Sequence, residues 1–106
     1  RSHTINRFRD DGRSVILWGA AGKGIVAADT FIRSGIEILA AADADRPKWD
    51  LFLECSGVKV WSPDRVSDIL GRAPRAVVAV PNPRHVPDVQ RELGTTVFVE
   101  ALASAR

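Results

Sequence analysis

Short apolar runs alternate with amphipathic stretches along the chain. Each run holds four to seven residues, is rich in Val, Ile, Leu and Ala, and is bounded by Gly, Pro or polar residues. Continuous apolar runs of this length are typical of strands that are covered on both faces. We expect strands at residues 14–18, 36–42, 58–61, 76–80 and 96–99.

Between these runs, apolar residues recur at three- and four-residue spacing, which predicts helices with one buried face. We expect helices at residues 25–34, 63–70 and 84–93, and a lead-in helical turn at 4–10. Gly35 should end the first helix, while Ser62 caps the second, with Pro63 at its first position and Gly71 after its end. The expected inward side chains are Ile25, Ala28, Ile32, Val66, Ile69, Leu70, Val86, Val89, Leu93, Ile5 and Phe8.

Strands that alternate with helices of about ten residues predict right-handed crossovers and a mostly parallel sheet with helices on both faces. The expected fold is a three-layer, doubly wound α/β fold of the Rossmann-like kind, in one domain at residues 13–100. Residues 1–12 are expected to be a lead-in segment and 101–106 a tail. Residues 48–57 lack a regular pattern, and we expect their apolar side chains to cover the sheet edge as a lid: Trp49, Leu51, Phe52 and Leu53.

In doubly wound folds, ligands bind in a crevice outside the carboxyl ends of the strands, where the winding direction reverses. After the predicted strands come residues 19–24, 43–46 and 81–85 and Glu100. These segments are the candidate site.

The first strand is followed by Gly19, Ala20, Ala21, Gly22, Lys23 and Gly24. Gly19, Ala21 and Gly24 occupy the three positions of the dinucleotide-binding fingerprint. The methyl group of Ala21 would hold a diphosphate farther away, and the neighbouring Gly22 restores backbone freedom. The helix N-terminus suits any phosphate or carboxylate, so an anion site is the minimal prediction, and a turn whose glycines serve only packing is the alternative.

Asp43 ends the second strand about 20 residues after the glycine turn, where a Rossmann acidic side chain accepts hydrogen bonds from a ribose. The alternative is a turn residue that binds its own backbone, and Asp45 and Arg46 are secondary candidates. Lys23 is a candidate phosphate ligand. After the fourth strand, Pro81, Asn82 and Arg84 are candidate ligand contacts.

His85 follows in the same loop, but without a neighbouring carboxylate it reads as a surface histidine rather than a general base. The single cysteine, Cys55, cannot form an internal disulfide and is expected to be an inert buried thiol. We predict neither a metal site nor a catalytic constellation.

The charge pattern restricts the function classes. The net charge is +2, with 15 basic and 13 acidic residues scattered along the chain, which does not indicate nucleic-acid binding. Every apolar run is shorter than a membrane span requires, so we expect a cytoplasmic protein. The chain contains no Met, which leads us to expect that it belongs to a longer protein whose other domains are its partners.

Residues 13–24, 43–49 and 58–63 together resemble the Rossmann-like domains of sugar-modifying transferases. One branch is the carboxy-terminal domain of sugar C-methyltransferases. The other is the amino-terminal domain of sugar acetyltransferases, with a related domain that precedes polysaccharide methyltransferases. The resemblance spans residues 13–99 and implies that Gly19, Ala21, Gly22 and Lys23 lie near phosphate or substrate, and Asp43 near a sugar hydroxyl. The first branch usually has a glycine-rich segment with proline after its second strand, where residues 48–57 of this chain are rich in Trp and Leu.

Three hypotheses follow. The leading one is a nucleotide or nucleotide-sugar binding domain of a larger transferase, with a nucleotide sugar or S-adenosylmethionine as the ligand and no chemistry of its own. The second is an NAD(P)-binding oxidoreductase domain. The third is a scaffold or regulatory domain that has lost the ligand, in which Trp18, Trp49 and Trp61 contribute to a partner surface rather than to the core.

Overall fold

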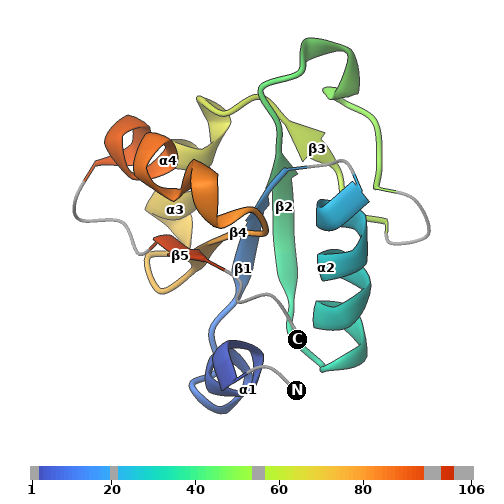
Figure 1. Ribbon diagram of the computed structural model, residues 1–106, viewed down its shortest axis with the longest axis vertical. Helices are drawn as coiled ribbons and strands as arrows, with labels where there is room; N and C mark the ends of the chain where they lie inside the picture. Colours follow the sequence, from blue (N-terminus) through green and yellow to red (C-terminus); the bar gives the residue numbers. More distant parts are fainter. Residues whose placement is uncertain (1–2, 20–21, 54–56, 95–98, 102–106) are drawn as a thin grey trace.

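The computed structural model describes residues 3–19, 22–53, 57–94 and 99–101. Within them, five strands form one sheet in the order β3-β2-β1-β4-β5, and every neighbouring pair is parallel (Figure 1). The strands are β1 (Val15–Trp18), β2 (Ile38–Ala42), β3 (Val60–Trp61), β4 (Val77–Val80) and β5 (Val99–Ala101). The predicted doubly wound parallel fold is confirmed, with β1 at the centre of the sheet.

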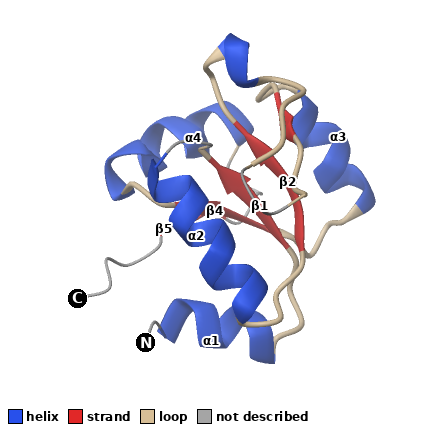
Figure 2. Ribbon diagram, turned by 90° about the vertical axis from the view of Figure 1, so that its right-hand side faces the viewer, coloured by secondary structure: helices blue, strands red, loops and turns tan. Residues whose placement is uncertain are grey.

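The helices cover both faces of this sheet, as expected. They are α1 (His3–Asp10), α2 (Gly22–Arg33), α3 (Arg65–Arg72) and α4 (Val86–Leu93), with 3-10 turns η1 (Arg46–Lys48) and η2 (Pro83–His85). Figure 1 shows α2 on one side of the sheet, α3 and α4 on the other, and α1 beyond the amino ends of the strands, and Figure 2 shows the same arrangement from the side.

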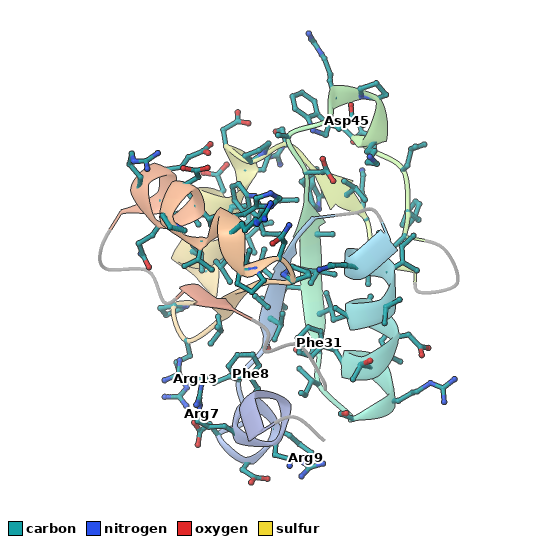
Figure 3. All side chains as sticks on the ribbon, in the orientation of Figure 1. Arg7, Phe8, Arg9, Arg13, Phe31 and Asp45 are labelled. Carbon is teal, nitrogen blue, oxygen red and sulfur yellow. The ribbon has the colours of Figure 1, made fainter. Side chains whose placement is uncertain are left out.

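Alternation along each strand divides the buried residues between two cores. Leu17 faces α1 and α2, whereas its neighbour Ile16 faces α3 and α4, because successive strand side chains point to opposite faces. On the α2 side, the rings of Phe8 and Phe31 stack with their centroids 6.3 Å apart, which ties α1 to the main core (Figure 3). The inward positions of Phe8, Ala28, Val66 and Val89 are therefore confirmed.

The first crossover helix differs from its prediction at both its start and its buried face. It begins at Gly22, three residues earlier than expected, so part of the glycine turn is helical. Ile32 was expected inside but is 46% exposed, and Phe31 is fully buried in its place, since the buried stripe passes through Ala28 and Phe31. Gly35 ends the helix as predicted, at φ +77°, and Ile36 N–H donates to the Phe31 carbonyl at 3.0 Å in a Schellman pattern.

The ends of α3 and the start of α4 also correct the sequence reading. Gly71 lies inside α3 rather than beyond it, and the N-cap position is Asp64 rather than Ser62. The Ser62 carbonyl accepts from Arg65 N–H at 3.1 Å, so a turn precedes the helix. The predicted helix at 84–93 is divided into η2 and α4. Ile5 lies in α1, but its side chain, like residues 95–98 and Cys55, lies outside the described part of the structure.

Residues 50–53 run back along the outer edge of β3 instead of crossing a face of the sheet. Asp50 N–H donates to the Val60 carbonyl at 2.8 Å, and Val60 N–H donates to the Leu51 carbonyl at 2.8 Å. Leu53 is buried and Trp49 packs against the α2-side core, but Leu51 and Phe52 are 56% and 63% exposed. The lid prediction is therefore wrong for those two side chains, because edge-to-edge pairing satisfies the backbone of β3 without burying every apolar group.

Candidate functional site

The parallel register brings the ends of four strands to one level. Trp18 pairs with Ala42, and Gly19 N–H donates to the Ala42 carbonyl at 2.7 Å. On the next strand, Asp43 N–H donates to the Trp61 carbonyl at 3.1 Å. Leu17 pairs with Ala79, so residues 81–85 follow β4 at the same level. We call the ends of these strands and the residues that follow them, with the start of α2, the carboxyl edge. The winding reverses there between β1 and β4.

Two glycines of the turn have a structural reason to be glycine. Gly19 has φ +125°, a conformation that side chains disfavour. Gly24 is buried, and a Cβ placed on it would clash with the Gly19 carbonyl oxygen, because the two atoms would lie closer together than Cβ atoms and their neighbours do in proteins. The start of α2 is therefore pressed against the end of β1, as the first and third fingerprint glycines predict. Ala20 and Ala21 lie outside the described residues.

The amino terminus of α2 is at the carboxyl edge, because this helix returns the chain from β1 to the start of β2. The first amide groups of a helix have no carbonyl partner within the helix, and the helix dipole adds positive potential there. Lys23 is exposed, and its side chain makes no hydrogen bond or ion pair with another described residue. Gly22 and Lys23 thus stand in the helical turn that an anion would meet.

Asp43 is half-buried, and it organises the loop after β2. Its Oδ1 accepts from Asp45 N–H at 2.8 Å, and its carbonyl oxygen accepts from the Trp49 indole N–H at 2.6 Å. The alternative prediction for Asp43, a turn residue whose side chain binds the nearby backbone, is therefore confirmed. The ribose role stays a prediction, because one carboxylate can accept several hydrogen bonds.

Within the same loop, the Lys48 ammonium lies 2.9 Å from Asp45 Oδ2. That hydrogen bond raises the pKa of Lys48 above its ordinary value, against a smaller opposing effect of burial, and the charges of Asp45 and Asp43 raise it further. The Arg46 guanidinium lies over the Trp49 ring, 5.7 Å from its centroid. Both cations of η1 therefore have partners within the loop.

The loop after β4 is held by its own backbone. Asn82 Oδ1 accepts from Arg84 N–H at 3.1 Å and caps η2, so this predicted ligand contact also has a structural role. Pro81 is half-buried, whereas Arg84 and His85 are exposed. The side chains of Arg84 and His85 make no hydrogen bond or ion pair with another described residue. Their positions leave both available to a ligand at this edge.

Trp61 ends β3 at the carboxyl edge, and the sequence analysis did not predict the two cations that lie on its ring. Two cations lie over its half-buried ring: the Lys59 ammonium, 4.3 Å from the ring centroid, and the Arg65 guanidinium, at 4.7 Å. Strand alternation was the available signal, since it places residues 59 and 61 on one face. All three tryptophans are half-buried. Trp18 and Trp49 pack against the two cores, and Trp61 packs against Lys59 and Arg65, so each is at least partly a packing residue.

No family model matches the chain, and no curated protein matches its sequence. Solved structures do match. UDP-D-quinovosamine 4-dehydrogenase from Vibrio fischeri has a TM-score of 0.69 at 19% identity, over 87% of this chain and 79% of that chain. RSP, a Rex-family repressor, in complex with β-NADH has a TM-score of 0.64 at 18% identity, over 92% of this chain and 59% of that chain.

A second structure of RSP, in complex with β-NAD+ and operator DNA, has a TM-score of 0.61 at 18% identity, over 85% of this chain and 50% of that chain. The chain thus spans between half and three fifths of the RSP chains that it matches. At these identities the likeness shows the fold, and the fold is Rossmann-like.

None of the described helices is both long and apolar enough to cross a membrane. In the same residues, no group of three or more His, Cys, Asp or Glu side chains is arranged to hold a metal ion.

Proposed function

We propose that this chain binds a dinucleotide of the NAD type at the carboxyl edge. The diphosphate lies at Gly19 and the first turn of α2, and Asp43 accepts hydrogen bonds from the adenosine ribose. One observation carries the proposal: Gly24 packs directly on the backbone of Gly19 at the end of the central strand, beside the point where the winding reverses. That packing presents the helix terminus to a ligand in the way that dinucleotide sites require.

The charge on either side of the turn supports an anionic ligand. Lys23 belongs to the first turn of α2, and Arg84 belongs to the loop that follows the neighbouring strand β4. Both side chains are exposed cations without an ion-pair partner among the described residues. A diphosphate between the two strands would supply the missing counter-charge.

The solved neighbours support the NAD-type ligand over the nucleotide-sugar transferase. One neighbour is a dehydrogenase of a UDP-sugar, and the two RSP structures are complexes with β-NADH or β-NAD+. Nothing among them favours a methyltransferase or acetyltransferase. One RSP complex contains operator DNA, but we do not propose DNA binding for this chain, because its basic and acidic residues are interspersed. Because the chain covers only part of RSP, the proposal concerns binding and assigns no reaction.

Amide shifts of the labelled protein test the proposal. We expect NADH to give saturable shifts at Gly19, Gly22, Lys23, Gly24 and Asp43, and to leave the amides of α1 unchanged. UDP-glucose and S-adenosylmethionine, titrated separately, should have no comparable effect. Shifts at these amides with UDP-glucose or S-adenosylmethionine and not with NADH would return the site to the transferase hypothesis. If none of the three ligands shifts these amides, the scaffold hypothesis would remain.

Asp43→Asn tests the ribose contact without dismantling the loop. The amide oxygen of Asn can still accept from Asp45 N–H, but the charge and one acceptor are lost. A hydrogen bond to a charged group contributes about 1.5–3 kcal/mol, so NADH affinity should fall by roughly tenfold or more. Asp68→Asn, which removes an exposed carboxylate on α3, is the matched control and should bind NADH normally.

A further inference from the structure

The loop after β2 carries two cations close to the proposed ribose acceptor. Arg46 and Lys48 follow Asp43 by three and five residues. In Rossmann sites an acidic residue here favours the free ribose hydroxyl of NAD, whereas a nearby cation accommodates the 2′-phosphate of NADP. The sequence holds both kinds of residue, so by itself it leaves the choice of cofactor open.

The structure gives each cation a partner. Lys48 is held by Asp45 at 2.9 Å, and Asp45 N–H donates to Asp43 Oδ1 at 2.8 Å, so one residue joins Lys48 to the proposed ribose acceptor. Arg46 lies over Trp49, and Trp49 is itself tied to the Asp43 carbonyl. Figure 3 shows Asp45 on this loop, at the opposite end of the molecule from Arg7, Arg9 and Arg13.

We propose that Asp45 is a specificity-determining residue: by holding Lys48 it keeps that ammonium from a ribose 2′-phosphate, and the site therefore selects NAD(H) over NADP(H). This inference rests on the proposed function. It assigns Asp45 a role that differs from that of Asp43, since Asp45 acts on the cofactor through Lys48.

The charge balance of the loop explains the selection. Asp43, Asp45, Arg46 and Lys48 sum to zero, so the loop offers no net attraction to a 2′-phosphate, which brings between one and two negative charges. Replacing Asp45 by the isosteric Asn leaves a net charge of +1 and releases the Lys48 ammonium. Lys48 can then pair with a phosphate as a mobile point charge.

Calorimetric titrations with NADH and NADPH test the inference in three variants. The unaltered chain should bind NADH at least tenfold more tightly than NADPH. Asp45→Asn should raise NADPH affinity by about tenfold and change NADH affinity by less than threefold. Adding Lys48→Gln to Asp45→Asn should abolish the gain, because the released ammonium is its source.

Asp50→Asn is the matched control. Asp50 also pairs with a lysine, Lys59 at 3.5 Å, and its replacement changes the net charge by the same amount without releasing Lys48. It should leave the ratio of the two affinities unchanged. Thermal unfolding of every variant checks that a lost affinity is not a lost fold.

The outcomes separate the two proposals. If the unaltered chain binds neither cofactor, the proposed function fails and this inference fails with it. If it binds both equally, or if Asp45→Asn does not change the ratio, the inference is wrong and the proposed function stands. A gain in NADPH affinity that survives Lys48→Gln, or that Asp50→Asn reproduces, would show a general charge effect and overturn the role of Asp45.

Discussion

The carboxyl edge of the sheet has two halves that treat their charges differently. In the switch half, at residues 19, 22–24 and 81–85, the side chains of Lys23, Arg84 and His85 have no hydrogen-bond or ion-pair partner among the described residues. In the flank half, at residues 43–50 and 59–65, each described cation lies on a tryptophan ring, beside a carboxylate, or both. The same edge thus has unpaired cations in one half and paired cations in the other.

This difference concerns recognition more than stability. Exposed ion pairs contribute about 0–1 kcal/mol, so the pairs of the flank half add little to the free energy of unfolding. They cancel the local field and hold the side chains in one arrangement. The switch half keeps its field, which attracts anions, and that contrast is why we place phosphate at one half and ribose at the other.

The largest expected effect comes from Gly24→Ala, which breaks the switch half itself. Its Cβ would meet the Gly19 carbonyl, so α2 must shift away from β1. Overpacking of this kind costs about 1–3 kcal/mol, which thermal unfolding would register as a lower Tm, and NADH binding should be lost. Gly71→Ala is the control, since the space around Gly71 in α3 is open; it should stabilise the protein by up to about 1 kcal/mol. Equal Tm values for the two variants would contradict the close packing.

Gly22→Asp should separate ligand binding from stability in the switch half. A carboxylate in the first turn of a helix is favourable, so the Tm should stay within a few degrees of the unaltered value. The same charge competes with a phosphate, so we expect NADH affinity to fall by at least about tenfold. Gly22→Asn has the same size without the charge and should bind NADH more tightly than Gly22→Asp. Equal NADH affinities of the two variants would mean that the size of the side chain, and not its charge, weakens binding.

A smaller effect is expected from the unpartnered cations. Lys23→Gln and Arg84→Gln should each weaken NADH binding by about threefold to tenfold, and the loss should shrink at 0.5 M salt because exposed charges are screened. Arg46→Gln in the flank half is the comparison variant and should change NADH affinity by less than twofold, since its guanidinium already lies on Trp49. If Arg46→Gln weakened binding as much as Arg84→Gln did, the division into two halves would be wrong.

The smallest effect concerns Asp64 in the flank half. The Ser62 hydroxyl donates to the Asp64 carboxylate and lowers its pKa, with help from the Asp64 backbone amide and Arg65. A lowered folded-state pKa contributes stability above the ordinary pKa and loses it as pH falls through the folded value. Ser62→Ala should therefore raise the Asp64 pKa in an NMR titration. Its slight destabilisation should be present at neutral pH and vanish in acid, and an unmoved pKa would exclude the Ser62 contact.

The sequence by itself determined the order of strands and helices, and with it the Rossmann-like fold. Apolar runs and helical spacing depend on residues close together in the chain, and the conformations of Gly19 and Gly35 are local properties of the backbone. The candidate positions Gly19, Gly24, Asp43 and Arg84 came from the same reasoning, and the structure places them along one edge.

Only the tertiary structure decided which cations have partners and which apolar side chains are buried. Ile32 and Phe31 are neighbours with similar hydrophobicity, and Phe31 is the buried one because of the direction in which α2 packs on the sheet. The stacking of Lys59 and Arg65 on Trp61 depends on where α3 begins relative to β3. Such contacts join residues through space, and the energies involved are too small and too dependent on geometry for a local pattern to predict them.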